Sequence, residues 1–210
     1  LYKDIFIEFA PFGYQINSTL ISIFPDKLIT LEAMAFINST LLLFGLYLLL
    51  NFFIKNNFFI KLAILSLIIT TSFYSINQTN YIYPYSYAII YGLNAFTWAL
   101  YFLVHFAENK DLKFLYISLF LYGVCVMCKY EFIPIGIIYI VVLFKNLKNK
   151  KEIIYSLSSF MTVPLISFIG LLCKGVSFSD IKQSVIYASA LMNADSIHAL
   201  YEAKRIYTKC

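Results

Sequence analysis

No aspartate, glutamate, lysine or arginine occurs between Leu62 and Ala107, and this long uncharged stretch limits the folds open to the chain more than any other feature. A second uncharged stretch runs from Ala33 to Ile54. A transmembrane helix needs about 20 mostly apolar residues, so both stretches are long enough to cross a bilayer. Of all residues 61% are hydrophobic and 13% are charged, against roughly 45–50% and about 25% in soluble domains. We therefore expect an all-α, polytopic transmembrane helix bundle, which excludes a disordered chain, a nucleic-acid-binding domain and a disulfide scaffold.

The uncharged stretches and the polar breaks between them predict about six spans. The stretch 62–107 is too long for one helix, and the polar, aromatic residues 75–83 followed by Pro84 divide it in two. Proline suits the first turn of a helix because its missing N–H is not needed there. The predicted spans are residues 33–54, 58–74, 84–107, 112–129, 131–145 and 153–173.

Lysines are distributed unevenly between the two sets of span ends. Short cytoplasmic loops carry an excess of Lys and Arg, so the lysine-rich set should be cytoplasmic. The set whose short loops carry Lys27 and Lys129 should be extracytoplasmic. The N-terminal segment, the 75–83 loop, and the turn at 129–131 are then predicted to face outside. The lysine-rich set comprises Lys55, Lys61, Lys110, Lys113, Lys145, Lys148, Lys150 and Lys151.

Residues 12–24 predict a shorter helix of another kind. Pro11 opens this helix and Pro25 closes it, and apolar side chains from Phe12 to Phe24 recur on one face. Such a pattern is typical of an amphipathic helix that lies on the membrane surface, here the outer one.

The expected organisation has three parts. Residues 1–26 form a first extracytoplasmic loop with its interfacial helix, residues 27–173 form the transmembrane helices, and residues 174–210 form an extracytoplasmic helical segment. The chain begins at Leu1 and stops abruptly at Cys210, so we expect it to be a fragment of a longer plasma- or inner-membrane protein.

Two carboxylates, Asp4 and Glu8, lie just before the interfacial helix. Residues four apart share a face of a helix. A carboxylate near a low-dielectric interface tends to have a raised pKa and can serve as a general base. The same pair could hold a divalent cation, and the simpler alternative is two solvated loop acids. Apart from that cation, no cofactor is expected.

Lys129 and a group of tyrosines are further candidates on the outer side. Lys129 can hold an anionic group such as a lipid-linked phosphate, or it can be an interfacial lysine paired with Glu131. Tyr81, Tyr83 and Tyr85 follow one another in the loop at 80–87. Aromatic rings stack on sugars, although an aromatic belt marks any membrane interface.

The CxxC spacing of Cys125 and Cys128 does not predict a metal site. The pair lies in an apolar span without a second pair or a nearby histidine. Two buried small hydrophobic side chains are the simpler interpretation.

Three short strings resemble the GT-C glycosyltransferases, in particular the bacterial relatives of protein O-mannosyltransferases and lipid A aminoarabinose transferase. Residues 2–14, YKDIFIEFAPFGY, resemble the first extracytoplasmic loop of that family. Residues 123–134, GVCVMCKYEFIP, resemble its later glycine-containing helix that ends in a lysine. The string at 83–85 is also similar.

The resemblance implies transfer of a sugar from a polyprenyl-phosphate donor to an extracytoplasmic protein, lipid or glycan. It implies catalytic roles for Asp4 and Glu8, although Phe9 and Ala10 replace the more usual Lys-Pro after the second acid. It implies that Lys129 approaches the carrier phosphate. The alternatives are a transporter or lipid flippase and a non-catalytic assembly protein, and the nearly charge-free spans favour the transferase because transporters place charges at mid-membrane.

Overall fold

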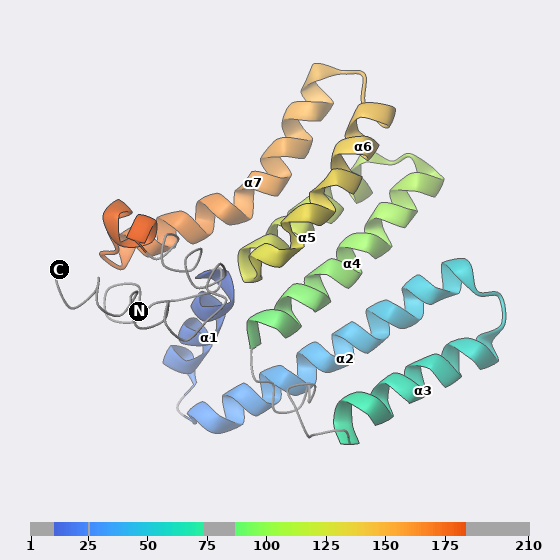
Figure 1. Cartoon of the computed structure of the whole chain (residues 1–210), viewed down its shortest axis with the longest axis horizontal. Helices are drawn as coiled ribbons and strands as arrows, with labels where there is room; N and C mark the ends of the chain where they lie inside the picture. The colour runs from blue at the N-terminus through green and yellow to red at the C-terminus, as the bar shows by residue number, and fades with distance from the viewer. Residues whose placement is uncertain (1–10, 25, 74–86, 184–210) are drawn as a thin grey trace, which may run out of the picture. The chain divides into compact units, whose positions relative to one another are not determined.

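The described part of the protein is built from helices alone. A computed structural model describes residues 11–24, 26–73 and 87–183, and every regular element in those ranges is a helix (Figure 1). The all-α prediction is therefore confirmed for this part of the chain. The helices are α1 (Pro11–Ile23), α2 (Lys27–Phe53), α3 (Asn57–Phe73), α4 (Tyr87–Asn109), α5 (Leu112–Cys128), the 3-10 helix η1 (Tyr130–Ile135), α6 (Gly136–Asn146) and α7 (Lys150–Cys173).

Contacts divide the chain into two compact units. One unit runs from Ala10 to Ser167 and contains α1 to α6 with most of α7. The described residues of the other unit are 168–183, which include the end of α7 and a helical segment at 178–183. Within that second unit the rings of Phe168 and Phe178 pack with centroids 5.2 Å apart.

Three helices are long and apolar enough to cross a membrane, namely Leu28–Phe53, Tyr87–Asn109 and Lys150–Cys173. They correspond to three of the predicted spans. The helices α3 and α5 have 17 residues each, and the predicted span 131–145 is divided into η1 and the 11-residue α6. The full set of six spans stays a prediction, because these helices are shorter than about 20 residues.

Sequence signals explain several helix ends. Asp26 begins α2 as its N-cap, since its carboxylate accepts the backbone N–H groups of Leu28 and Ile29 at 3.1 Å each. Asp111 begins α5 in the same way and accepts from the N–H of Lys113 at 3.0 Å. Pro11 stands at the first position of α1 as predicted.

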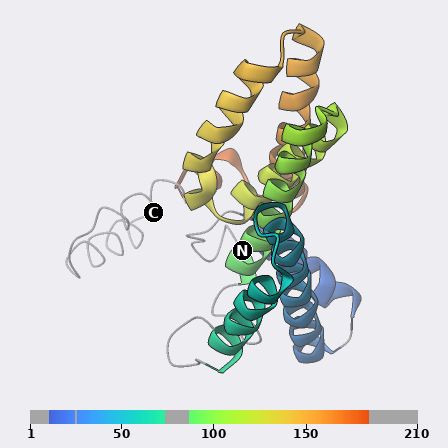
Figure 2. The same ribbon diagram turned by 90° about the vertical axis from the view of Figure 1, so that its right-hand side faces the viewer.

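In the larger unit, α4 packs between α2 and α5 (Figures 1 and 2). The interface of α4 and α2 contains the rings of Phe44 and Trp98, whose centroids lie 6.0 Å apart. It also contains a buried hydrogen bond of 3.0 Å from Asn94 to Asn38. Helix α3 packs on α2 and leaves most of its apolar side chains exposed.

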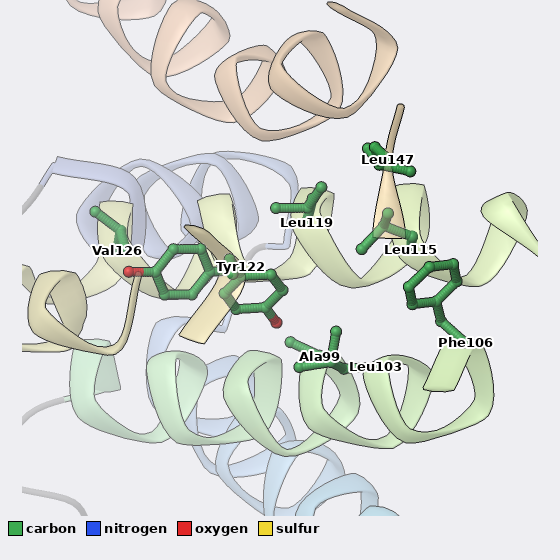
Figure 3. Packing of buried hydrophobic residues seen from close by; sticks show 9 residues of the cluster. Ala99, Leu103, Phe106, Leu115, Leu119, Tyr122, Val126 and Leu147 are labelled. Carbon is green, nitrogen blue, oxygen red and sulfur yellow. The ribbon is translucent and has the colours of Figure 1, made fainter. Parts of the chain in front are cut away.

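The main hydrophobic core lies between α4 and α5, and α6 and the loop that follows it close this core. Tyr122 stacks on Tyr139 of α6 with ring centroids 4.6 Å apart. Leu147 inserts from the loop after α6 and is 6% exposed (Figure 3). The buried members of this core are Ala99, Leu103, Phe106, Leu115, Leu119, Tyr122, Val126, Tyr139 and Leu147.

Candidate functional site at Lys129

Lys129 occupies the junction between α5 and η1. Its backbone is extended, with φ −154° and ψ 121°, so that the α-helix ends there and the 3-10 helix begins. Its N–H donates to the carbonyl of Cys125 at 3.0 Å, and its carbonyl accepts from the N–H of Phe132 at 3.3 Å. Both neighbouring turns therefore fix the backbone of Lys129.

The side chain of Lys129 forms an ion pair with Glu131. The ammonium nitrogen Nζ lies 3.0 Å from the carboxylate oxygen Oε1, and the two side chains are 21% and 56% exposed. An ion pair open to solvent contributes about 0–1 kcal/mol, so an anionic ligand can compete with Glu131 for the ammonium group. This pair is the one that the alternative interpretation of Lys129 proposed, and the role of Lys129 toward a phosphate stays a prediction.

Tyr122 holds η1 against the end of α5. Its hydroxyl lies 3.1 Å from the carbonyl oxygen of Phe132 and 2.9 Å from that of Ile133, and its proton is shared between them. A buried carbonyl that lacks a partner costs free energy, so these contacts stabilise the turn. They position the backbone that carries Lys129 and Glu131.

The start of α4 and helix α1 lie at the same end of the unit as Lys129. The ring of Phe132 packs on Phe96 with centroids 5.6 Å apart, and a methyl group on Gly92 would lie 3.0 Å from the ring of Phe132. Next to Gly92, the hydroxyl of Tyr91 donates to the side-chain oxygen of Asn17 of α1 at 2.6 Å. Helix α1 contacts α2, α4 and α5.

Helix α1 is attached to this end through polar side chains. Gln15 donates to the carbonyl of Ser167 at 2.9 Å, and the hydroxyl of Ser167 donates back to the Gln15 amide oxygen at 2.8 Å. Gly13 lies against Ala88, whose Cβ would be 3.0 Å from a Cβ at position 13. The apolar residues Ile23 and Phe24 are 64% and 51% exposed. These bundle contacts were not predicted, because the sequence shows the amphipathic pattern of α1 and not its partners.

The thiols of the CxxC pair are buried. Cys125 and Cys128 are both 0% exposed and lie on the face of α5 that meets α4 at Gly92, as expected for small hydrophobic side chains. Across the described ranges, no three His, Cys, Asp or Glu side chains gather as a metal site would require.

The other predicted site residues lie outside the described residues. These are the carboxylates Asp4 and Glu8, with their alternative as a cation site, and the loop tyrosines Tyr81, Tyr83 and Tyr85. The predicted outer segment at 174–210 is described only as far as residue 183.

Neither the family models nor the curated proteins nor the solved structures compared with the chain gave a match.

Proposed function

We propose that the protein is a GT-C-type membrane glycosyltransferase that moves a sugar from a polyprenyl-phosphate donor to an extracytoplasmic acceptor. The observation that carries the proposal is the position of Lys129. Its side chain stands at the end of an apolar helix, is 21% exposed, and pairs with a solvent-exposed carboxylate. A lysine in that position suits the phosphate of a lipid whose tail lies in the membrane.

The proposed reaction is an inverting substitution at the anomeric carbon of the sugar. A carboxylate, Asp4 or Glu8, takes the proton of the acceptor hydroxyl while the acceptor oxygen bonds to the anomeric carbon. The bond from that carbon to the phosphate oxygen breaks, and polyprenyl phosphate leaves with the electron pair. Lys129 stabilises the charge that develops on this phosphate. Tyr81, Tyr83 and Tyr85 supply aromatic and hydroxyl contacts to the sugar or acceptor.

The lysine-rich ends of the larger unit support the orientation that this reaction needs. Lys110 and Asn146 join the α4–α5 loop to the end of α6 through a hydrogen bond of 3.2 Å, and Lys129 lies at the opposite end of α5. Under the positive-inside rule the lysine-rich end is cytoplasmic. Lys129 then faces the side on which lipid-linked sugars are used.

The test is sugar transfer by the full chain in proteoliposomes that contain a polyprenyl-phosphate sugar. Asp4→Asn should lower kcat by about 10²- to 10⁴-fold, the usual contribution of a general base, with unchanged expression. The matched control is Glu108→Gln, which removes an exposed carboxylate at the lysine-rich end. Undiminished transfer by Asp4→Asn removes Asp4 from the mechanism.

The proposed role of Lys129 is tested by measuring how well its variants use the polyprenyl-phosphate sugar donor. Lys129→Ala should weaken use of the donor by about 10- to 100-fold, because a hydrogen bond to a charged group contributes about 1.5–3 kcal/mol. Lys129→Arg should retain most of the use of the donor. Lys55→Ala, which alters an exposed lysine of the α2–α3 loop, should leave use of the donor unchanged. Uptake of lipid or solute without any transfer supports the transporter or flippase instead.

A further inference from the structure

Six lysines gather on two neighbouring loops at the end of the larger unit away from Lys129. All six side chains are exposed, and they come from the α4–α5 and α6–α7 loops and from the ends of α5, α6 and α7 beside these loops. We call them the lysine cluster, which consists of Lys110, Lys113, Lys145, Lys148, Lys150 and Lys151.

The two loops are held together by specific contacts. The ammonium group of Lys110 donates to the side-chain oxygen of Asn146 at 3.2 Å and lies 5.7 Å from the centre of the Phe106 ring. Leu147 is buried in the same core as Phe106 and Leu115 (Figure 3). The backbone of Lys110 is left-handed, with φ 58°, and its N–H ends α4 by donating to the Phe106 carbonyl at 2.8 Å. These contacts therefore fix the two loops that carry the lysine cluster relative to each other.

The positive charge of the lysine cluster is only partly balanced. The acidic residues of the same helix ends are Glu108, Asp111 and Glu152, which leaves six positive against three negative charges. The carboxylate of Asp111 accepts the N–H of Lys113 as a helix cap. Among the described residues, none of the six ammonium groups lies within ion-pair distance of a carboxylate.

An exposed apolar stripe leads along α6 to the lysine cluster. Its members follow an i, i+3, i+4, i+7 pattern and so share one face of the helix. Helix α6 has 11 residues and is therefore about 16 Å long, which is close to half of the about 30 Å hydrocarbon core. The stripe consists of Ile137, Ile140, Val141 and Phe144, with exposures of 66%, 52%, 58% and 86%.

We propose that the lysine cluster and the α6 stripe together bind an anionic phospholipid of the adjacent leaflet. The headgroup phosphate lies against the ammonium groups, and an acyl chain lies along α6, whose length matches one leaflet. This site does not depend on the proposed transferase activity. It is also distinct from the Lys129 junction, which lies at the far end of the 17-residue α5, about 25 Å along that helix.

The stripe favours a lipid over a soluble anion. A free phosphate would need the ammonium groups alone, and its binding would leave the four apolar side chains of α6 without a partner. A phospholipid satisfies both features at once, because its charged headgroup and its acyl chain belong to one molecule and Lys145 directly follows Phe144 of the stripe. The aromatic ring of Phe144, next to Lys145, suits the boundary between headgroup and chain.

The test is native mass spectrometry of the full chain in detergent, with either phosphatidylglycerol or phosphatidylcholine added. We expect phosphatidylglycerol to bind about tenfold more tightly or better. Neutralising Lys110, Lys113, Lys145 and Lys148 together (each Lys→Gln) should abolish that preference. The matched control is Lys55→Gln with Lys61→Gln, two exposed lysines of the α2–α3 loop and the start of α3, which should retain the preference. Phe144→Ser should weaken the binding of phosphatidylglycerol while leaving the lysines intact.

Three outcomes would overturn the proposal. Equal binding of the two lipids by the unaltered chain excludes an anionic site, and this measurement needs no variant to fold. An unchanged preference in the neutralised variant excludes the lysine cluster. Inorganic phosphate that displaces phosphatidylglycerol at equal concentration, together with no effect of Phe144→Ser, shows a simple anion site in place of a lipid site.

Discussion

Gly123 is a residue at which α5 comes close to α7. A Cβ at this position would lie 2.6 Å from the carbonyl oxygen of Phe160, a distance that carbon and oxygen do not tolerate. Pro164 stands four residues after Phe160 within α7. Because proline has no N–H, the Phe160 carbonyl lacks its usual donor four residues later in α7. The absence of a side chain at Gly123 lets α5 approach this carbonyl.

We predict that Gly123→Ala lowers the free energy of unfolding by about 1–3 kcal/mol, the usual cost of overpacking. The added methyl group must push the backbone of α7 away, and backbone does not yield as a flexible side chain does. Thermal unfolding in detergent measures the loss of stability. Ala63→Val adds volume on the exposed face of α3 and should change stability little. A Gly123→Ala variant as stable as the parent would contradict the close approach of α5 and α7.

Helix α1 shows at the scale of an element how polar contacts fix a short helix. Its pairs, Gln15 with Ser167 and Asn17 with Tyr91, link it to α7 and α4. Neither pair follows from the amphipathic pattern. Inside a bilayer such hydrogen bonds gain little over alternative partners and average about 0.6 kcal/mol, so the register of α1 depends on several of them acting together.

A double-mutant cycle tests the first pair. Gln15→Ala and Ser167→Ala should each destabilise the protein, and the double variant should cost less than their sum by about 0.6 kcal/mol or somewhat more, because the two hydrogen bonds are lost together. Unfolding in mixed detergents gives the change in the free energy of unfolding for the two single variants and the double variant. Ser22→Ala, which removes an exposed hydroxyl bonded only within α1, should combine additively with Ser167→Ala. Full additivity for Gln15 and Ser167 would show that they do not interact.

Sequence reasoning succeeded for elements whose ends carry local signals. The start of α1 at Pro11 follows from proline chemistry, and apolar stretches predicted the long helices α2, α4 and α7. It was less accurate where tertiary contacts decide. The predicted span 131–145 begins as the 3-10 helix η1, because Pro134 interrupts the turn and Tyr122 binds the carbonyls of Phe132 and Ile133. At the candidate site, the neighbouring charges of Lys129 and Glu131 suggested their ion pair as one alternative. No sequence pattern indicated the hydrogen bonds of the Tyr122 hydroxyl.

At the scale of the whole molecule, the testable quantity is which helix ends face the cytoplasm. The lysine-rich ends should lie inside, and the end with α1 and Lys129 should lie outside. We predict that Ser22→Cys is labelled by a membrane-impermeant maleimide in intact cells. Lys148→Cys should be labelled only after permeabilisation. Both side chains are exposed, and the variants are made with Cys173 and Cys210 replaced by serine. The opposite labelling pattern would reverse the orientation and argue against an extracytoplasmic Lys129.

The contact between Gln15 and Ser167 also has a consequence for biosynthesis. It joins residues 152 positions apart, and ribosomes add about 5–20 residues per second. Gln15 is therefore made roughly 8–30 s before its partner Ser167 exists. During that interval α1 has only its contacts with α2, α4 and α5 as these helices are made, and its exposed Ile23 and Phe24 suit it to the membrane surface.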